Sequence, residues 1–379
     1  MVYLSCSYIP YEISLAAGMP TKRGVFERTL PSMEGYLPRD FCPYAKAFLR
    51  HYGNDDVIAI AESCDAMRRV YDVLRYWNLA DSVHFIDVPR TCDSQAVAFY
   101  GEELRSFAAS LVGSEALLSA EFQANLKSAI EGMNKIRMRL SKVFDLLSKG
   151  QISSLTATRL AMSVNQILSD FPATRDCGVT ETNSKYSLAP GMIRSVTEKA
   201  EELTIRTISE SRLIRQDEDR IPVGVTGTCL LDLSLLDCID SAGLDVVFID
   251  SCLPMRTYSF IVESESTSDP FYDLAEAYLR KPPCPRMFRG KEQVERIYKQ
   301  ASDYGAQGII YFAPKFCDQA YYDFLQVRRG LRSLSCLPVL LLEGQYGVGN
   351  TGQAATRLSA FREMLEARRI SKEGKHKCY

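Results

Sequence analysis

Cysteine is the residue type whose number and placement most need a chemical explanation in this sequence. The chain has 12 cysteines in 379 residues, and no two of them have the spacing C-x-x-C. Cys64, Cys229, Cys252 and Cys317 each follow a segment with the pattern of a buried strand. Open parallel sheets bind their ligands beyond the carboxyl ends of their strands. We therefore expect these thiols to lie at such an edge.

The small number of histidines and the absence of C-x-x-C limit the kinds of metal site that these thiols could form. Cys64 also precedes a helical pattern, and a helix N-terminus favours the thiolate that binds metals. Cys42 and Cys284 each precede a proline in a loop-like segment and could reach the same edge. Only three histidines occur, which disfavours a histidine-rich site, and the missing C-x-x-C removes the usual zinc-ribbon and ferredoxin signatures. Thiolates from distant segments suit an iron–sulfur cluster better than one hard cation.

Composition excludes several classes of function. The formal net charge of −2 gives no basic field for nucleic acid, so we expect no nucleic-acid binding. There is no apolar run of about 18 residues and the N-terminus does not resemble a signal peptide, so we expect a cytoplasmic protein with no membrane span. Disulfides are rare in that compartment, which favours metal binding or catalysis as the role of the cysteines.

The elements that must position these thiols form two α/β regions separated by helices. Strand patterns, most of them followed by helical patterns, predict two parallel, doubly wound sheets. The strands are expected at 56–63, 82–88, 221–227, 244–250, 308–313 and 337–343. Residues 117–171 and 192–215 have helical periodicity, and 172–189 is expected to be a loop. We predict an N-terminal α/β domain (1–112), a helical domain (113–217) and a C-terminal α/β domain (218–379).

Eight segments, in this order, carry a family resemblance. They are CSYIPYEISLAAGMP, LPRDFCPYAK, ESCDAMRRVYDVLR, AIEGMNKIRMRL, SAGLDVVFIDSC, LRKPPCPR, YGAQGIIYFAPKFCDQ and LPVLLLEGQYGVGNTGQAATRLSAFREML. Together they resemble the 2-hydroxyacyl-CoA dehydratase subunits, which are related to benzoyl-CoA reductase subunits and to double-cubane cluster proteins. The resemblance implies two Rossmann-like (flavodoxin-like) domains and a helical domain. It also implies that Cys42, Cys64 and Cys317 bind a [4Fe-4S] cluster, leaving one iron free to meet substrate.

The activity implied by the resemblance is a radical lyase reaction that requires anaerobic conditions. An ATP-hydrolysing iron–sulfur activator protein supplies one electron, which reaches the thioester carbonyl of a 2-hydroxyacyl-CoA. The resulting ketyl radical expels the neighbouring hydroxyl group, and the electron is returned. Enzymes of this type are usually pairs of related subunits, so a second subunit or a homodimer is expected.

Two alternatives remain open. Cys252 and Cys284 stand where double-cubane relatives have further ligands, and Cys6, Cys92 or Cys229 would complete a set of six. Such a chain would be a homodimeric reductase of small molecules with an [8Fe-9S] cluster. The other alternative is an accessory protein that has kept the fold and holds zinc or no metal.

Other residues have weaker signals. Glu12 is a candidate base, and Arg68 a candidate for holding an anionic substrate. The glycines of GVGNTG, from Gly347 to Gly352, have the spacing G-x-G-x-x-G. A dinucleotide fold needs a further strand ending in an acidic residue about twenty positions later, and too little chain follows. We interpret these glycines as turn formers before a helix, with binding of an anion such as a CoA phosphate by residues 350–353 as the alternative.

Overall fold

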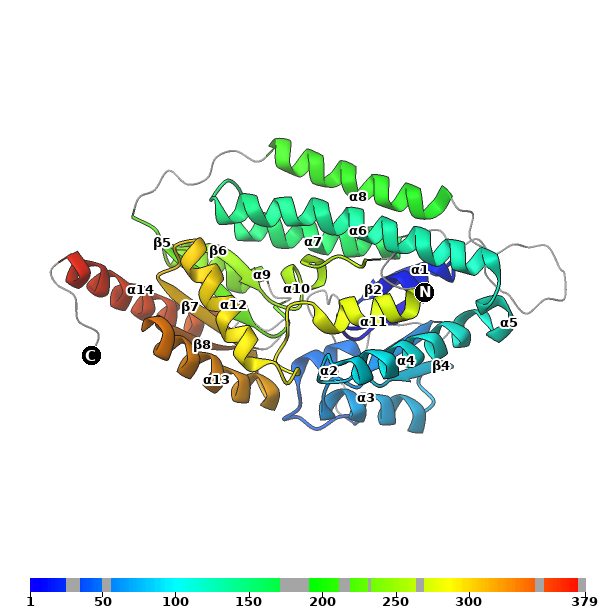
Figure 1. Cartoon of the computed structure of the whole chain (residues 1–379). Coiled ribbons are helices and arrows are strands. Elements are labelled where there is room, and N and C mark those ends of the chain that lie inside the picture. The colour runs from blue at the N-terminus through cyan, green and yellow to red at the C-terminus, as the bar shows by residue number, and fades with distance from the viewer. Residues whose placement is uncertain are drawn as a thin grey trace.

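The computed structural model describes residues 1–24, 35–49, 56–170, 191–210, 219–230, 233–263, 269–344 and 351–373. Within them the chain forms two four-stranded parallel sheets, flanked by helices and joined along one side by a layer of long helices (Figure 1). The predicted α/β fold with helices between the two sheets is confirmed. No helix in the described residues is long and apolar enough to cross a membrane.

The N-terminal sheet has the strand order β2-β1-β3-β4. Its strands are β1 (Val2–Leu4), β2 (Thr21–Arg23), β3 (Val57–Ala61) and β4 (Ser82–Ile86), and its helices are α1 (Tyr11–Ala16), α2 (Pro43–Phe48), α3 (Asp65–Tyr76) and α4 (Ser94–Val112). The two predicted strands of this region, β3 and β4, are confirmed. We did not predict β1 and β2, because three residues are too few for a recognisable pattern.

The C-terminal sheet has the order β6-β5-β7-β8. Its strands are β5 (Ile221–Gly227), β6 (Leu244–Asp250), β7 (Gly308–Pro314) and β8 (Val339–Gly344), and its helices are α9 (Leu233–Ser241), α12 (Gly290–Asp303), α13 (Asp318–Ser335) and α14 (Thr351–Glu373). All four predicted strands are confirmed. They could be recognised in the sequence because near-continuous apolar runs are typical of strands buried on both faces. At the end of β5 only glycine fits: Gly227 has φ 122°, and a Cβ there would lie 2.1 Å from the Phe312 carbonyl oxygen.

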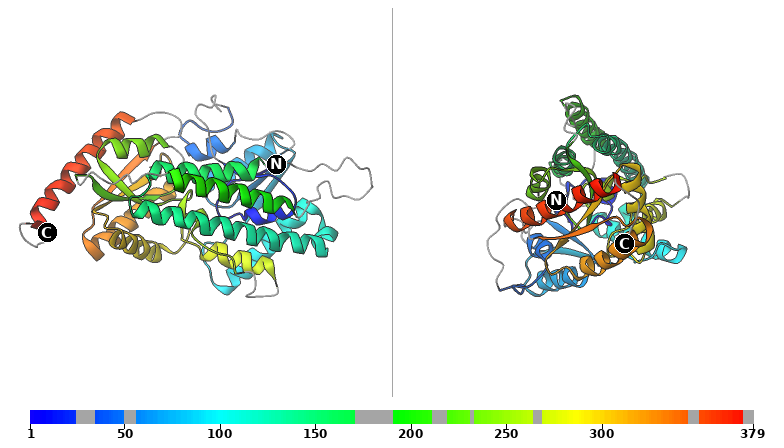
Figure 2. Two further views of the ribbon diagram at one scale, coloured as in Figure 1. Left: turned by 90° about the horizontal axis from the view of Figure 1, so that it is seen from above. Right: turned by 90° about the vertical axis from the view of Figure 1, so that its left-hand side faces the viewer.

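The helical region consists of α5 (Ser114–Leu117), α6 (Ala120–Ser148), α7 (Ser154–Ser169) and α8 (Gly191–Glu210). The side chains of Ser119 and Ser153 cap α6 and α7 by accepting backbone hydrogen bonds. Seen from above, α6, α7 and α8 run together along the molecule (Figure 2). Because α6 packs against both α1 and β6, the helical region joins the two sheets. The predicted loop at 172–189 lies outside the described residues.

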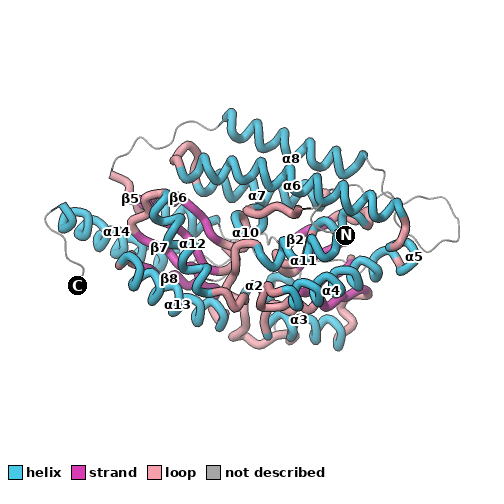
Figure 3. The backbone as a smooth tube through the Cα atoms, viewed as in Figure 1, coloured by secondary structure: helices cyan, strands magenta, loops and turns pink. Residues whose placement is uncertain are grey.

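Two further helices, α10 (Met255–Tyr258) and α11 (Pro270–Arg280), lie between β6 and α12 in the sequence. Helix α11 packs against α4 of the N-terminal region, where Arg105 and Asp269 form an ion pair of 2.7 Å. The chain therefore returns to the first sheet before it completes the second. As a result, loops from both α/β regions meet in the middle of the molecule (Figure 3).

Candidate functional site

Cys42, Cys64 and Cys317 line one pocket of about 1310 Å³ between the two α/β regions. The rest of its lining comes from residues 40–41, from the N-terminal halves of α3, α12 and α13, from Arg90 beyond β4, and from Pro285 and residues 287–289 and 316 in loops. The loops that follow strands of two separate sheets thus form a single site. We call these three residues the outer cysteine group.

Each thiol of the outer group stands at the start of a helix. Cys42, Cys64 and Cys317 are the N-cap residues of α2, α3 and α13. Helix α2 begins there because Pro43 occupies the first helical position, where no backbone donor is required. Backbone N–H groups at a helix N-terminus point outward and favour negative charge, so all three positions suit a thiolate ligand.

Burial opposes that charge when no metal is bound. It raises the pKa of Cys42 to about 11 and that of Cys317 to about 12, and it also raises the pKa of Cys64. The thiols also influence one another, because charge on Cys42 and on Cys64 raises the pKa of Cys317. Three buried or partly buried thiols that interact electrostatically need a cationic group before all of them can ionise.

The donor set fits a cluster better than a single ion. Within the described residues, no three or more His, Cys, Asp or Glu side chains are placed to hold one metal ion. A multi-iron cluster requires a wider spacing of its ligands, because each thiolate binds its own iron. Three thiols that line one pocket from three helix N-termini fit that requirement.

Hydrogen bonds between the two α/β regions fix the relative positions of these helix starts. The Gln319 side chain on α13 donates to the carbonyl of Ser63, next to Cys64, at 2.9 Å. On the other side of the pocket, the backbone N–H of Phe288 donates to the carbonyl of Arg90 at 2.8 Å. These bonds hold Cys317 beside the loop that carries Cys64, although the two residues are far apart in sequence.

Four other cysteines gather behind the outer group, and we call them the inner cysteine group. They are Cys6 after β1, Cys229 after β5, Cys252 after β6, and Cys284 in the loop after α11. Their thiol charges affect one another: the pKa of Cys284 is raised to about 11 by burial and then by Cys252 and Cys6. Charge on Cys6 also acts on Cys64, and charge on Cys42 acts on Cys229. The two groups are therefore neighbours, although the inner cysteines do not line the pocket.

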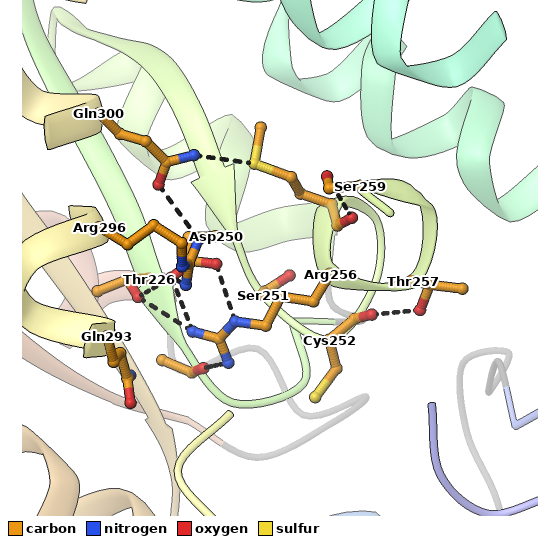
Figure 4. A network of polar contacts seen from close by, with 12 residues as sticks. Thr226, Asp250, Ser251, Cys252, Arg256, Thr257, Ser259, Gln293, Arg296 and Gln300 are labelled. Carbon is orange, nitrogen blue, oxygen red and sulfur yellow. Dashed lines mark hydrogen bonds and ion pairs between the residues drawn. The ribbon is translucent and has the colours of Figure 1, made fainter. Parts of the chain in front are cut away.

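A buried ion-pair network supports the strand ends that carry Cys229 and Cys252 (Figure 4). The Asp250 carboxylate accepts hydrogen bonds from Arg256 at 2.8 Å and from Arg296 at 2.6 Å, and Arg256 also donates to the Gly227 carbonyl at 2.8 Å. Burial alone would raise the pKa of Asp250, but the two guanidinium groups outweigh it and hold that pKa well below its usual range. Asp250 is therefore ionised and joins the ends of β5 and β6.

Nearly the whole chain also matches known proteins. Residues 6–365 match the family described as 2-hydroxyglutaryl-CoA dehydratase, D-component. The chain belongs to this family. The putative dehydratase subunit YjiM of Escherichia coli (strain K12) is 22% identical over 374 residues, which cover 95% of this chain and 90% of that protein. The (R)-phenyllactyl-CoA dehydratase beta subunit of Clostridium sporogenes is 23% identical over 367 residues, 94% of this chain and 90% of that subunit.

The family relationship confirms the resemblance seen in the sequence, and both relatives are named as subunits. In this member of the dehydratase family, the other candidate residues lie away from the cysteine pocket. Glu12 is fully buried and receives hydrogen bonds of 2.7 Å from Arg137 and from Tyr278. Arg68 is half exposed and pairs with Glu62. Cys92 is partly exposed, and none of these residues lines the pocket.

The glycine-rich segment is only partly described. Gly347 and Gly349 lie outside the described residues, and Gly352 stands in the first turn of α14. That helix continues to Glu373. No described strand follows α14, so the further strand of a dinucleotide fold is missing from the part of the chain that the structure describes.

Proposed function

We propose that this chain is the iron–sulfur subunit of a 2-hydroxyacyl-CoA dehydratase-type enzyme and that Cys42, Cys64 and Cys317 bind a [4Fe-4S] cluster. The observation that carries the proposal is the meeting of three thiols, each at a helix N-terminus, in one pocket between two sheets. Membership of the dehydratase family supports it. The proposal includes a second related subunit or a second copy, and an ATP-hydrolysing activator as the electron source.

When bound, the cluster would supply the low-potential electron that lets the hydroxyl group of a 2-hydroxyacyl-CoA leave. The chain's own residues would hold and shield the substrate beside it. Phe41, Met287, Phe288 and Phe316 give the pocket an apolar lining, which suits an acyl chain. At about 1310 Å³ the pocket has room for an acyl group as well as a cluster.

Asp323 is the residue of the pocket best suited to hold a proton. One of its carboxyl oxygens, Oδ2, accepts hydrogen bonds from the Tyr311 hydroxyl at 2.6 Å and from the Gln293 amide at 3.0 Å. Within the described residues the other oxygen, Oδ1, has no hydrogen-bond partner, and the residue lines the pocket. Burial raises the pKa of Asp323, which favours a protonated carboxyl group at the site of elimination.

The test is chemical analysis of protein purified without oxygen. About four irons and four acid-labile sulfides per chain are expected from the outer group alone, together with the visible absorption of a cluster. The Cys317→Ser variant should lose that absorption, whereas Cys238→Ser, which changes a partly buried cysteine on α9, should keep it. Full absorption in the Cys317→Ser variant would refute the ligand assignment. Dehydration of 2-hydroxyacyl-CoA thioesters in the presence of an activator then tests the activity.

The inner cysteine group favours a second candidate function, a homodimeric double-cubane reductase. Cys6 and Cys229 lie with Cys252 and Cys284, next to the outer group, whereas Cys92 does not line the site. About eight irons per chain, and ATP-driven reduction of small molecules, would favour this candidate over the dehydratase. If careful reconstitution gives no iron, both candidates fail and an accessory role remains.

A further inference from the structure

Three basic side chains are buried in the middle of the molecule without a carboxylate partner. Arg23, Lys281 and Arg286 are exposed by only 3%, 2% and 4%. No carboxylate among the described residues forms an ion pair with any of them. The other buried cations differ, because Arg137 pairs with Glu12 at 2.7 Å and Arg256 with Asp250 at 2.8 Å. A buried charge without a counter-charge is strongly unfavourable, so these three cations call for an anion.

The hydrogen bonds of the three cations go only to uncharged groups. Arg23 donates to the Cys252 carbonyl at 3.1 Å and to the Thr257 hydroxyl at 2.7 Å. Lys281 donates to the Ser7 carbonyl, and Arg286 donates to carbonyl groups that include Pro89 at 3.1 Å. These uncharged acceptors do not neutralise the charges.

The three basic residues lie around the inner cysteine group. Arg23 binds the backbone of Cys252, and Lys281 binds the residue that follows Cys6. Burial lowers the pKa of Lys281 to about 7, while charge on Cys6, Cys252 and Cys284 acts to raise it. Burial also acts to lower the pKa of Arg23, but charge on Cys229 and Cys252 helps to hold it above its usual value. In sequence, Lys281 and Arg286 stand on either side of Cys284. The cations therefore form one shell around four thiols.

Two buried polar atoms in this shell also lack a hydrogen-bond partner. They are the Tyr8 hydroxyl and Nε of Arg286, and the Arg286 guanidinium lies 5.4 Å from the centre of the Tyr8 ring. The Lys281 amino group lies over the same Tyr8 ring, 4.1 Å from its centre. An acceptor that binds beside Tyr8 would satisfy both atoms.

We propose that Arg23, Lys281 and Arg286 are the counter-charges of an anionic iron–sulfur group that binds next to the inner cysteine group, and that Lys281 raises its reduction potential. The inference rests on the proposed iron–sulfur function and assigns a role to residues that are not ligands. Reduction adds negative charge to the group, and a buried ammonium nearby stabilises the reduced form. Lys281 acts through this field and is a positioning residue, since it need not touch substrate.

The test is a redox titration of anaerobically reconstituted protein, in which Ti(III) gives one electron to the iron–sulfur group and becomes Ti(IV). Lys281→Met should make reduction about tenfold less favourable, which for one electron is a shift of about 59 mV to lower potential. Lys281→Arg should restore most of the potential. The control is Lys299→Met, which removes an exposed lysine paired with Asp303 and should leave the potential unchanged.

The outcomes separate this inference from the proposed function. If the wild-type protein binds no iron, both are wrong. If Lys281→Met binds iron as the wild type does and has the same potential, this inference is wrong and the proposed function stands. If Lys281→Met loses iron and Lys281→Arg keeps it, the counter-charge role is supported. Loss of iron from both variants would indicate a purely structural lysine and would overturn the inference.

Discussion

The outer and inner cysteine groups use the same residue type in opposite settings. The outer thiols line a pocket and stand at helix N-termini, where backbone N–H groups supply the favourable field. The inner thiols lie behind that pocket, inside a shell of buried side-chain cations. We propose from this difference that the outer group meets substrate and that the inner region sets the charge of the site. The predictions below test that difference.

Exchange of one cysteine in each group should give the largest contrast. We expect Cys64→Ser to remove the absorption of the outer cluster and to lower activity by more than about 100-fold, since loss of a direct ligand exceeds the 10–100-fold effect of its supporting partners. Cys284→Ser should keep at least about half of the iron. Iron and sulfide analysis of both variants, with activity, provides the measurement. Equal losses would show that the two groups do not differ in role.

The Asp250 network should matter for stability because it holds the strand ends beneath the inner group. Asp250→Asn leaves Arg256 and Arg296 without their carboxylate, and we expect the free energy of unfolding to fall by about 3–5 kcal/mol. Asp240→Asn breaks an exposed pair with Arg220 and should cost less than about 1 kcal/mol. Urea unfolding of both variants compares them, and similar losses would argue against a special role for the buried network.

Asp323 tests the outer side of the comparison. Asp323→Asn removes the proton-holding group but can keep the hydrogen bonds from Tyr311 or Gln293 in part. We expect dehydration to slow by about 100-fold or more while the absorption of the cluster is retained. Glu295→Gln, which changes an exposed residue at the edge of the same pocket, is the control and should stay near the wild-type rate. An unchanged rate in Asp323→Asn would remove this residue from the mechanism.

The smallest expected effect is a change in the pH dependence of stability. The folded pKa of Asp250 is depressed, so in the acid range the unfolded chain binds more protons than the native one at this residue. Its contribution is therefore present above about pH 4, the usual pKa of an aspartate, and is lost as the pH falls through the folded value. The stability difference between wild type and Asp250→Asn should shrink below about pH 4. A constant difference from neutral to acid pH would contradict the assignment.

Much of the fold could be predicted from local patterns. The strands β3 to β8 have apolar runs long enough to recognise, and α3, α4 and α6 have clear helical periodicity. The short strands β1 and β2 could not be predicted, and they decide that Cys6 also lies beyond the end of a strand. Which residues are ligands, and where the domains divide, stay predictions.

The amino-acid sequence by itself determined the two parallel sheets, the family, and the expectation that thiols gather at the strand ends. Only the tertiary structure decided which thiols share a pocket and which lie behind it. It also decided that Glu12 is ion-paired and that Arg23, Lys281 and Arg286 are buried without a carboxylate. The physical reason is that strand patterns depend on neighbouring residues, whereas the charge balance of a site depends on side chains that long-range packing brings together.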